Sequence, residues 1–293
     1  MQLQNHSDIR IGTLVPTGKA VSHLPQLLTH GFESFSLTFW QEIDVDLAQN
    51  GAQVREILGD KAVVSSLGFF GNPLQNEEHV RGFESCIDNA HLYGTNLVCG
   101  FAGALEGQEL PASMPQFKKV WSELARRAED RGVRIAFENC EMGGWWHDPH
   151  FNIAHSPTAW EMMFDAVPSE TLGLQWEPCH QMVSLVDPLP QLRKWIGKIF
   201  HVHGKDATIA WDVLRESGLR GGKPYVWHRT PGFGDTNWTD LISILRIGGW
   251  SGSIDIEGFH DPVYRGELEM TGQVHGLNYL KNCRGGAFVP NPQ

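Results

Sequence analysis

The sequence predicts an α/β fold, a (β/α)8 TIM barrel, and three observations lead to this prediction. Short apolar runs of β-prone residues alternate with amphipathic stretches along the chain. Eight such strand–helix pairs fit into 293 residues, close to the roughly 250 residues typical of this fold. No Ser-, Gly- or Pro-rich linker divides the chain. We therefore expect a single domain over residues 1–293 with elaborated loops. An open doubly wound sheet is the alternative, although no Gly-x-Gly-x-x-Gly follows the first strand.

The predicted strands are short runs in which apolar, β-prone residues predominate. They are Arg10–Leu14, Ser34–Trp40, Ala62–Phe69, Asn96–Phe101, Arg134–Asn139, Leu172–Trp176, Lys198–His203 and Gly252–Glu257. A strand followed by a helix, repeated in this way, implies parallel strands joined by right-handed crossovers.

The predicted helices lie near residues 19–29, 45–59, 77–92, 115–131, 157–167, 188–196, 238–247 and 263–282. In the fourth of them, Phe117, Trp121 and Leu124 recur at helical spacing. Ser156 and Asp187 each precede a proline, so we expect both to cap helices. The link over residues 206–237 is long, and a structureless link of that length usually serves a function, such as a lid over a site.

Composition excludes several classes of protein. Lys and Arg number 23 against 34 Asp and Glu, a formal charge of −11, and no basic stripe is present, so nucleic acid is not an expected partner. Apolar runs are far shorter than the roughly 18 residues of a membrane helix, and the first residues do not resemble a secretory signal. The 5 cysteines include no Cys-x-x-Cys pair, which favours reduced thiols. We expect a cytoplasmic protein without a membrane partner.

Four consecutive predicted strands, the fifth to the eighth, end in potential metal ligands, and active sites of this fold lie at the C-terminal ends of the strands. These ligands are Glu138, Glu177, His203 and Glu257. Three carboxylates at one barrel mouth repel one another unless some are protonated or a cation lies among them. Three carboxylates and one imidazole suit Mn²⁺, Mg²⁺ or Co²⁺ better than Zn²⁺, whose catalytic sets are richer in His or Cys. We expect His203, and not His201, to face the barrel axis.

These residues belong to motifs that resemble those of the sugar phosphate isomerase/epimerase-like family, the barrels related to xylose isomerase. The resemblance covers nearly the whole chain, and its motifs are Phe137-Glu138-Asn139, Glu177-x-x-His180, His203-x-Lys205-Asp206, Pro231-Gly232-Phe233-Gly234 before Trp238, and Ile256-Glu257-Gly258. It implies one divalent cation, often Mn²⁺, held by Glu138, Glu177, His203 and Glu257. It also implies that Glu138 and Glu257 move protons and that His180 contacts substrate.

The resemblance implies a metal-dependent sugar isomerase or epimerase. A metal that bridges a carbonyl and a hydroxyl acidifies the neighbouring C–H, and a base removes that proton to give a metal-bound enediolate. The alternative is a lyase, in which the same enolate eliminates water or an aglycone from an inosose or a 3-keto-glycoside, as in inosose dehydratase-like and C-glycoside deglycosidase-like members. His180, His147 and His150 compete with Glu138 and Glu257 as bases, because imidazole titrates near neutral pH.

The sequence departs from the ketose epimerases of this family at three positions. Glu177 stands where they usually have Asp, Gly144 where they have a further Glu, and Ile209 where they have an Arg. Because the groups that grip a free ketose are not reproduced, isomerase, epimerase and lyase all stay open.

The expected substrate is a small, non-phosphorylated carbohydrate. Trp145, Trp146 and His150 follow the fifth strand, and the indole rings offer flat faces to a sugar ring or an aglycone. Lys205 and Arg229 are the two cations that we place near the barrel mouth, too few for a phosphate site.

Two further classes of protein stay as alternatives. An endonuclease IV-like barrel needs three metals and a basic surface, and the charge of −11 disfavours it. A non-catalytic binding subunit would tolerate loss of the ligand set. Oligomeric state stays open between a homo-oligomer and a hetero-oligomer with a small subunit.

Overall fold

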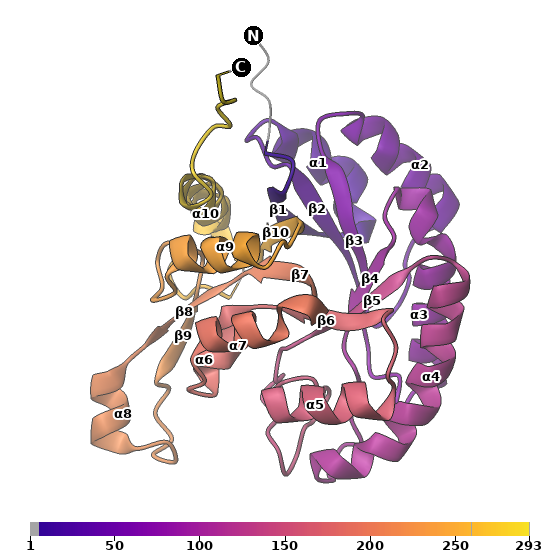
Figure 1. Ribbon diagram of the computed structural model, residues 1–293, viewed down its shortest axis with the longest axis vertical. Coiled ribbons are helices and arrows are strands. Elements are labelled where there is room, and N and C mark those ends of the chain that lie inside the picture. Colours follow the sequence, from indigo (N-terminus) through magenta and orange to yellow (C-terminus); the bar gives the residue numbers. More distant parts are fainter. Residues whose placement is uncertain (1–5, 259, 293) are drawn as a thin grey trace. The chain divides into compact units, whose positions relative to one another are not determined.

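The computed structural model describes residues 6–258 and 260–292. Eight strands form a closed barrel in the order β1-β10-β7-β6-β5-β4-β3-β2, with helices between successive strands of the chain (Figure 1). The barrel strands are β1 (Ile9–Pro16), β2 (Ser34–Trp40), β3 (Val63–Phe70), β4 (Leu97–Gly100), β5 (Arg134–Glu138), β6 (Leu172–Trp176), β7 (Ile199–Gly204) and β10 (Gly252–Ile256). Each predicted strand is present, and the predicted (β/α)8 barrel is confirmed.

Each segment that was predicted to be helical contains a helix, although the last one begins at Gly266 rather than near residue 263. The α-helices are α1 (Ala20–Leu28), α2 (Leu47–Leu58), α3 (Glu77–Asn89), α4 (Met114–Asp130), α5 (Pro157–Ala166), α6 (Pro178–Val183), α7 (Pro188–Trp195), α8 (Trp211–Ser217), α9 (Trp238–Ile247) and α10 (Glu269–Cys283). The 3₁₀ helices are η1 (Thr17–Lys19), η2 (Ala90–Tyr93), η3 (Leu110–Ser113), η4 (Ile196–Lys198) and η5 (Gly266–Leu268). Ser156 and Asp187 cap α5 and α7 as expected.

The chain forms two compact units. Unit 1 comprises Met1–Thr13, Glu177–Gly197 and Val202–Gln293, and unit 2 comprises Leu14–Trp176 and Lys198–His201. The single domain over residues 1–293 stays a prediction. None of the described helices is long and apolar enough to cross a membrane, and the five cysteines are free thiols.

In unit 2, α4 packs on β5 and fixes the strand that ends in Glu138. Trp121 of α4 is fully buried, its ring lies edge-on to Phe137 at 4.6 Å and to Phe83 at 5.0 Å, and its indole N–H donates to the carbonyl of Ala102 at 2.8 Å. The apolar stripe that predicted this helix is thus its buried face.

In unit 1, β10 lies between β1 and β7. Asp255 pairs with Gly12 on one side and with His203 on the other. The backbone N–H of Glu257 donates to the carbonyl of Gly204 at 3.2 Å, so the ladder continues one residue past the end of β10. The register therefore fixes the backbone of Glu257 beside the end of β7.

The prediction that residues 206–237 form a structureless link was wrong. Strands β8 (Asp206–Ile209) and β9 (Val226–Arg229) pair antiparallel, with α8 between them. Each strand has only four residues, and α8 separates them, so they lack the direct two-residue turn by which a hairpin is found in a sequence. Helix α6 was missed for the same reason of length, since it has six residues.

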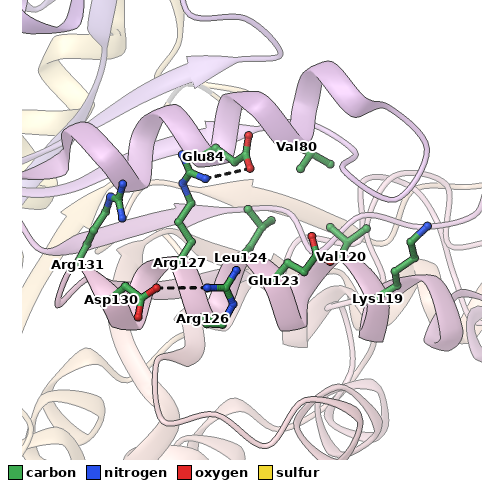
Figure 2. Close-up of a pocket in the computed structure, with 10 residues that line it drawn as sticks. All are labelled: Val80, Glu84, Lys119, Val120, Glu123, Leu124, Arg126, Arg127, Asp130 and Arg131. Atoms are coloured by element: carbon green, nitrogen blue, oxygen red, sulfur yellow. Dashed lines mark hydrogen bonds and ion pairs between the residues drawn. The ribbon is translucent and has the colours of Figure 1, made fainter.

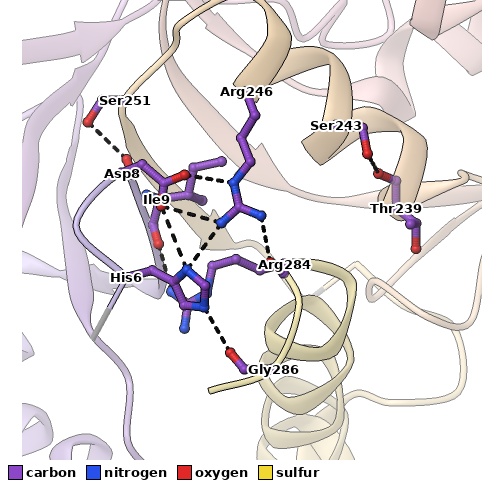
Figure 3. A network of polar contacts seen from close by, with 9 residues as sticks. All are labelled: His6, Asp8, Ile9, Thr239, Ser243, Arg246, Ser251, Arg284 and Gly286. Atoms are coloured by element: carbon purple, nitrogen blue, oxygen red, sulfur yellow. Dashed lines mark hydrogen bonds and ion pairs between the residues drawn. The ribbon is translucent and has the colours of Figure 1, made fainter. Parts of the chain in front are cut away.

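Both ends of the described chain in unit 1 are held by one polar network (Figure 3). Arg246 of α9 donates to the Asp8 carboxylate at 2.7 Å and to the carbonyl of Arg284 at 2.7 Å. Arg284 donates to the carbonyl of Ile9 at 2.6 Å, and His6 is 3.0 Å from the carbonyl of Gly286. The network joins the start of β1, α9 and the segment that follows α10.

Candidate functional site

The four predicted metal ligands lie at the C-terminal ends of four barrel strands. Glu138 is the last residue of β5, Glu177 follows β6, His203 is the next-to-last residue of β7, and Glu257 follows β10. Their exposed fractions are 6%, 0%, 0% and 6% in that order. Acidic side chains are almost never buried unless they are paired or bind a cation, so burial at this end of the strands is consistent with the predicted role.

Three of the four ligands, Glu177, His203 and Glu257, belong to unit 1, and each offers one donor atom within 4.8 Å of the others. His203 Nδ1 lies 3.2 Å from Glu257 Oε2. Two adjacent ligands that are each about 2.1 Å from one ion are separated by roughly 3 Å. The spacing and the mixture of carboxylates and imidazole therefore fit a divalent cation.

Glu257 has one oxygen that lies near His203 and another that Lys205 and His260 contact. Its Oε1 accepts a hydrogen bond from Lys205 Nζ at 2.7 Å and lies 3.2 Å from His260 Nδ1. Lys205 is 2% exposed, so this is a buried ion pair. The carboxylate is thus oriented, with Oε2 directed toward the donor set and Oε1 toward the two basic side chains.

Lys205 also links the two carboxylates through a histidine. His180 Nε2 lies 3.3 Å from Lys205 Nζ and 2.9 Å from Glu177 Oε1. Pro178 occupies the first turn of α6, and this helix places His180 one turn beyond Glu177. The motif Glu177-x-x-His180 is therefore one helical turn that brings a carboxylate and an imidazole together.

The two predicted ligand carboxylates of unit 1, Glu177 and Glu257, are ionised at neutral pH. Burial acts to raise the pKa of Glu257, but the charge of Lys205 and the neighbouring imidazoles of His203 and His260 hold it well below its usual range. Burial also acts against the charge of Glu177, and the nearby His180 and Lys205 lower its pKa. The site is thus prepared to bind a cation rather than a proton.

Two histidines near Glu257 and His180, namely His228 and His260, were not predicted from the sequence. The ring of His228 lies edge-on to that of His180 at 5.2 Å and to that of His260 at 5.8 Å. Glu257-x-x-His260 repeats the spacing of the Glu177 motif, and this repeat could have identified His260. His228 lies on β9, which was not predicted, so the sequence held no comparable signal for it.

The segment after Lys205 is anchored by the buried carboxylate of Asp206. It accepts hydrogen bonds from the indole N–H of Trp238 at 2.9 Å and from the backbone N–H of Thr236 at 3.1 Å. Burial nevertheless raises the pKa of Asp206. A Cβ at Gly234 would collide with this carboxylate, so the close approach of the backbone requires glycine. The motif from Pro231 to Trp238 therefore holds the base of Lys205 in place.

In unit 2, the backbone of Glu138 is held by Asn152. The Asn152 amide donates to the carbonyl oxygens of Glu138 and Cys140 at 2.9 and 2.8 Å. Glu138 pairs in register with Gln175 of β6, and Gln175 Nε2 lies 3.0 Å from His201 Nδ1. His201 and His203 both lie on β7, two residues apart. Residues at this spacing point to the same face of a strand, so the expectation that only one of them faces the barrel axis was wrong.

The loop after β5 carries the predicted catalytic residue His147 and the predicted substrate-binding residues Trp145, Trp146 and His150. His147 lies 2.7 Å from the Glu109 carboxylate, with 54% of its side chain exposed, and its ring is edge-on to that of Trp145. His150 is 53% exposed and lies 3.3 Å from Asp148. Trp146 is half-buried. Their roles stay predictions.

Arg229, the other predicted cation of the site, is paired with a carboxylate in unit 1. Its Nε donates to Asp261 Oδ2 at 3.1 Å, and Asp261 also accepts from the backbone N–H of Thr230 at 2.9 Å. Its guanidinium lies 5.8 Å from the centre of the Phe233 ring. Through these contacts Arg229 supports the loop after β9. Its predicted contact with substrate stays a prediction.

A groove of about 320 Å³ lies between α3 and α4 in unit 2 (Figure 2). Its lining is mostly charged, and Arg127 pairs there with Glu84 at 3.3 Å and Arg126 with Asp130 at 3.5 Å (Figure 2). None of the predicted site residues lines it. Opposite charges pair along its wall, which makes the groove a seam between two packed helices rather than a catalytic pocket.

Comparison with known proteins agrees with this fold. A model of the Xylose isomerase-like TIM barrel family matches residues 24–283. The chain is 22% identical over 167 residues to an inosose dehydratase of Clostridium perfringens, covering 55% of this chain and 51% of the relative. It is 29% identical over 147 residues to an inosose isomerase of Halalkalibacterium halodurans, covering 50% of this chain and 46% of the relative. The chain thus spans about half the length of the curated relatives it matches.

Solved structures share the fold at low sequence identity. The 3-keto-D-glucoside 4-epimerase YcjR of E. coli superposes with a TM-score of 0.71 at 14% identity, covering 94% of this chain and 100% of the other. An IOLI protein with a bound zinc atom has a TM-score of 0.65 at 17% identity, covering 94% and 96%.

Proposed function

The chain belongs to the Xylose isomerase-like TIM barrel family, and from this premise we propose that it is a divalent-metal-dependent isomerase or epimerase of a non-phosphorylated keto-sugar. The proposal depends mainly on one observation: the ionised carboxylates of Glu177 and Glu257 and the imidazole of His203 are buried together at the strand ends in unit 1. The names of the relatives, an inosose isomerase and a sugar epimerase among them, support the same class of substrate.

Glu138, Glu177, His203 and Glu257 are the proposed ligands of one ion. Glu138 is included because it is buried at the end of β5 and pairs with Gln175, two residues before Glu177 on the neighbouring strand. A bound zinc in a protein of the same fold supports a divalent cation, and three carboxylates with one imidazole favour Mn²⁺. When bound, such an ion polarises a substrate carbonyl and acidifies the neighbouring C–H.

Glu257 is the proposed base that removes the proton from carbon. Its Oε2 lies 3.2 Å from His203 Nδ1 and its Oε1 2.7 Å from Lys205 Nζ, and in this proposal Oε1 is the oxygen that exchanges a proton with substrate. Lys205 and His260 contact the same oxygen and stabilise the charged form between turnovers. Glu138 is the proposed second base, which returns a proton and gives epimerisation or isomerisation according to the carbon that receives it. His180 is proposed to orient Glu177 and Lys205 and to contact a substrate oxygen.

The pairing of the local cations favours a neutral substrate. Lys205 is engaged by Glu257 and Arg229 by Asp261. A phosphate site normally uses arginine pairs or a helix N-terminus with open N–H groups. The two cations expected near the site are thus committed to protein carboxylates, which supports the non-phosphorylated substrate.

A lyase reaction is the second candidate, and the basic cluster on Glu257 favours it. Lys205 and His260 both contact one carboxylate oxygen, so a protonated group lies next to the proposed base. Such a group can protonate a leaving oxygen after the C–H bond is broken. The similarity to an inosose dehydratase supports this reading. The candidate substrates are an inosose that loses water and a 3-keto-glycoside that loses its aglycone.

The test is a substrate screen in heavy water with added Mn²⁺. We expect deuterium at a carbon next to the carbonyl, and product analysis then separates inversion, isomerisation and elimination. Glu257→Gln is expected to abolish exchange, whereas the exposed Glu267→Gln is the matched control and should not. Turnover of every accepted substrate without deuterium, or full activity in metal-stripped protein, would contradict the proposal.

A further inference from the structure

A second group of potential metal ligands lies within unit 1, in addition to the proposed ligands at the strand ends. Cys179, His180 and His228 each offer one donor atom, and these three atoms lie within 4.8 Å of one another. Cys179 and His180 are 0% and 2% exposed, and His228 is half-buried. The group contains a sulfur atom and no carboxylate, so its ligand chemistry differs from that of the strand-end set.

The three side chains come from two elements that are bound to each other. Cys179 and His180 lie in α6, and His228 lies on β9 (Figure 1). The Tyr225 hydroxyl, directly before β9, donates to the carbonyl of Val183 at the end of α6 at 3.0 Å. Strand β9 is in turn paired with β8. The donor atoms are therefore held together by tertiary contacts between a helix and a strand.

His180 has the hydrogen-bonding partner that a metal-binding histidine usually has. Such a histidine donates the N–H of its other ring nitrogen to a carboxylate or a carbonyl. His180 Nε2 lies 2.9 Å from Glu177 Oε1, where its N–H can donate. In this tautomer, Nδ1 carries the lone pair that a metal needs. Lys205 Nζ lies 3.3 Å from the same Nε2, but it donates to Glu257 at 2.7 Å.

The separations of the donor atoms are close to those of a tetrahedral site. Bond lengths of about 2.3 Å to sulfur and 2.1 Å to nitrogen place two ligands of one Zn²⁺ roughly 3.5 Å apart. The observed limit of 4.8 Å exceeds this by about 1 Å, which small side-chain rotations remove. The rings of His180 and His228 lie 5.2 Å apart and edge-on. The half-buried His228 also gives an ion a path of entry.

The surroundings of Cys179 favour a soft metal ion. Cys179 packs with Met182 and Ala207, and Ile209 and Val226 pack against this cluster. A buried cysteine in apolar surroundings is ordinarily inert, but a bound metal ion deprotonates the thiol that coordinates it. Thiolate and imidazole ligands favour Zn²⁺, whereas carboxylates favour Mn²⁺ and Mg²⁺. The two ligand sets of unit 1 therefore select different metals.

We propose that Cys179, His180 and His228 bind one Zn²⁺ ion at a site separate from the strand-end ligands. Three protein ligands leave the fourth position of a tetrahedral ion to water or another small ligand. Because His180 also contacts Glu177, bound Zn²⁺ fixes the ring that orients this carboxylate. The site does not depend on the proposed function, since no proposed strand-end ligand belongs to it.

The test uses Co²⁺, which substitutes for Zn²⁺ and reports a thiolate ligand by a charge-transfer band in the near ultraviolet. The reduced full chain is titrated with Co²⁺ in the presence of excess Mn²⁺. We expect the band in wild type, and added Zn²⁺ should displace Co²⁺ and remove it. Cys179→Ser should abolish the band and weaken Zn²⁺ binding at least about 100-fold, since loss of a mere supporting residue already costs 10- to 100-fold. Cys283→Ser is the matched control, because Cys283 is half-buried at the end of α10.

Two further variants separate this site from the strand-end set. His228→Gln keeps the thiol and should weaken Zn²⁺ binding at least about tenfold. Glu138→Gln removes a proposed strand-end ligand and should leave the band and the Zn²⁺ affinity unchanged. Thermal unfolding of each variant in a chelator verifies its fold, and if Cys179→Ser does not fold, the His228→Gln comparison decides.

Four results would overturn the inference. They are no band in wild type with excess Co²⁺, a full band in Cys179→Ser, equal loss of the band in Cys283→Ser, and equal Zn²⁺ affinity in wild type and His228→Gln. Because the readout is a thiolate band and not turnover, failure of the deuterium experiment and failure of this site are separate results.

Discussion

Replacing Lys205 with Met leaves the Glu257 carboxylate buried without its closest positive partner. The two charged atoms are 2.7 Å apart, and the side chains are 3% and 6% exposed. Removing one member of such a buried pair costs about 3–5 kcal/mol, because the remaining charge is desolvated and uncompensated. This is a large share of the roughly 5–15 kcal/mol that stabilises a typical domain. Met has nearly the length of Lys, so the loss measures charge more than volume.

The assay is urea unfolding followed by tryptophan fluorescence, once with a chelator and once with Mn²⁺ in excess. With the chelator, Lys205→Met should lose the full 3–5 kcal/mol or so. With Mn²⁺ the loss should be smaller, because an ion that binds only the folded protein adds stability according to its affinity. A carboxylate that has lost Lys205 attracts the ion more strongly, and titration calorimetry should therefore show tighter Mn²⁺ binding in the variant.

Lys223→Met is the matched control, since Lys223 pairs with Glu216 at 3.0 Å with 55% and 72% of the two side chains exposed. An exposed pair contributes at most about 1 kcal/mol, and its loss should not depend on Mn²⁺. If Lys205→Met were no more destabilising than Lys223→Met with the chelator, the buried pair would not exist in solution. An equal loss with and without Mn²⁺ would refute the assignment of Glu257 as a ligand.

Three other predictions concern the metal, acid stability and the core. Glu177→Gln should weaken Mn²⁺ binding, measured by calorimetry, at least about 100-fold. Glu129 is exposed, and Glu129→Gln should leave the affinity unchanged. Equal affinity in the two variants would remove Glu177 from the ligand set. The hydrogen bond from Arg127 lowers the pKa of Asp88 in the folded protein. The difference in unfolding free energy between wild type and Asp88→Asn should therefore be complete above about pH 4, the pKa of Asp in the unfolded chain, and should shrink as pH falls below it. A difference that grows in acid would contradict this sign. Trp121→Ala should cost about 3–5 kcal/mol in urea unfolding, and a loss below about 1 kcal/mol would show that its buried contacts contribute little.

The sequence was sufficient to predict the barrel because its strands are buried on both sides and read as continuous apolar runs. It also indicated the predicted ligands at the strand ends in unit 1, because a strand that ends in Glu or His after an apolar run is visible without any tertiary information. Glu177 and Glu257 each follow such a run directly. Local pattern and tertiary position coincide at these residues.

The parts that could not be predicted depend on contacts between residues far apart in the chain. The sequence marks Lys205 as a cation, but only the fold pairs it with Glu257, 52 residues later. His228 joins the histidine cluster only because β9 pairs with β8. Trp40 was predicted to end a strand, but its stacking against Phe151 of a distant loop is visible only in the fold. Side-chain partners of this kind have no signature in hydrophobic periodicity.

The pairing of the first strand with the last has a consequence for how the polypeptide is made. Thr13 of β1 hydrogen-bonds to Ile256 of β10, a separation of 243 residues. One edge of β1 therefore has no partner until the chain up to residue 256 has left the ribosome, and an open edge can pair with a neighbouring nascent chain. Contacts of such long range are also slow to form. Folding yield should accordingly depend on translation rate and on chaperones that shield newly made strands.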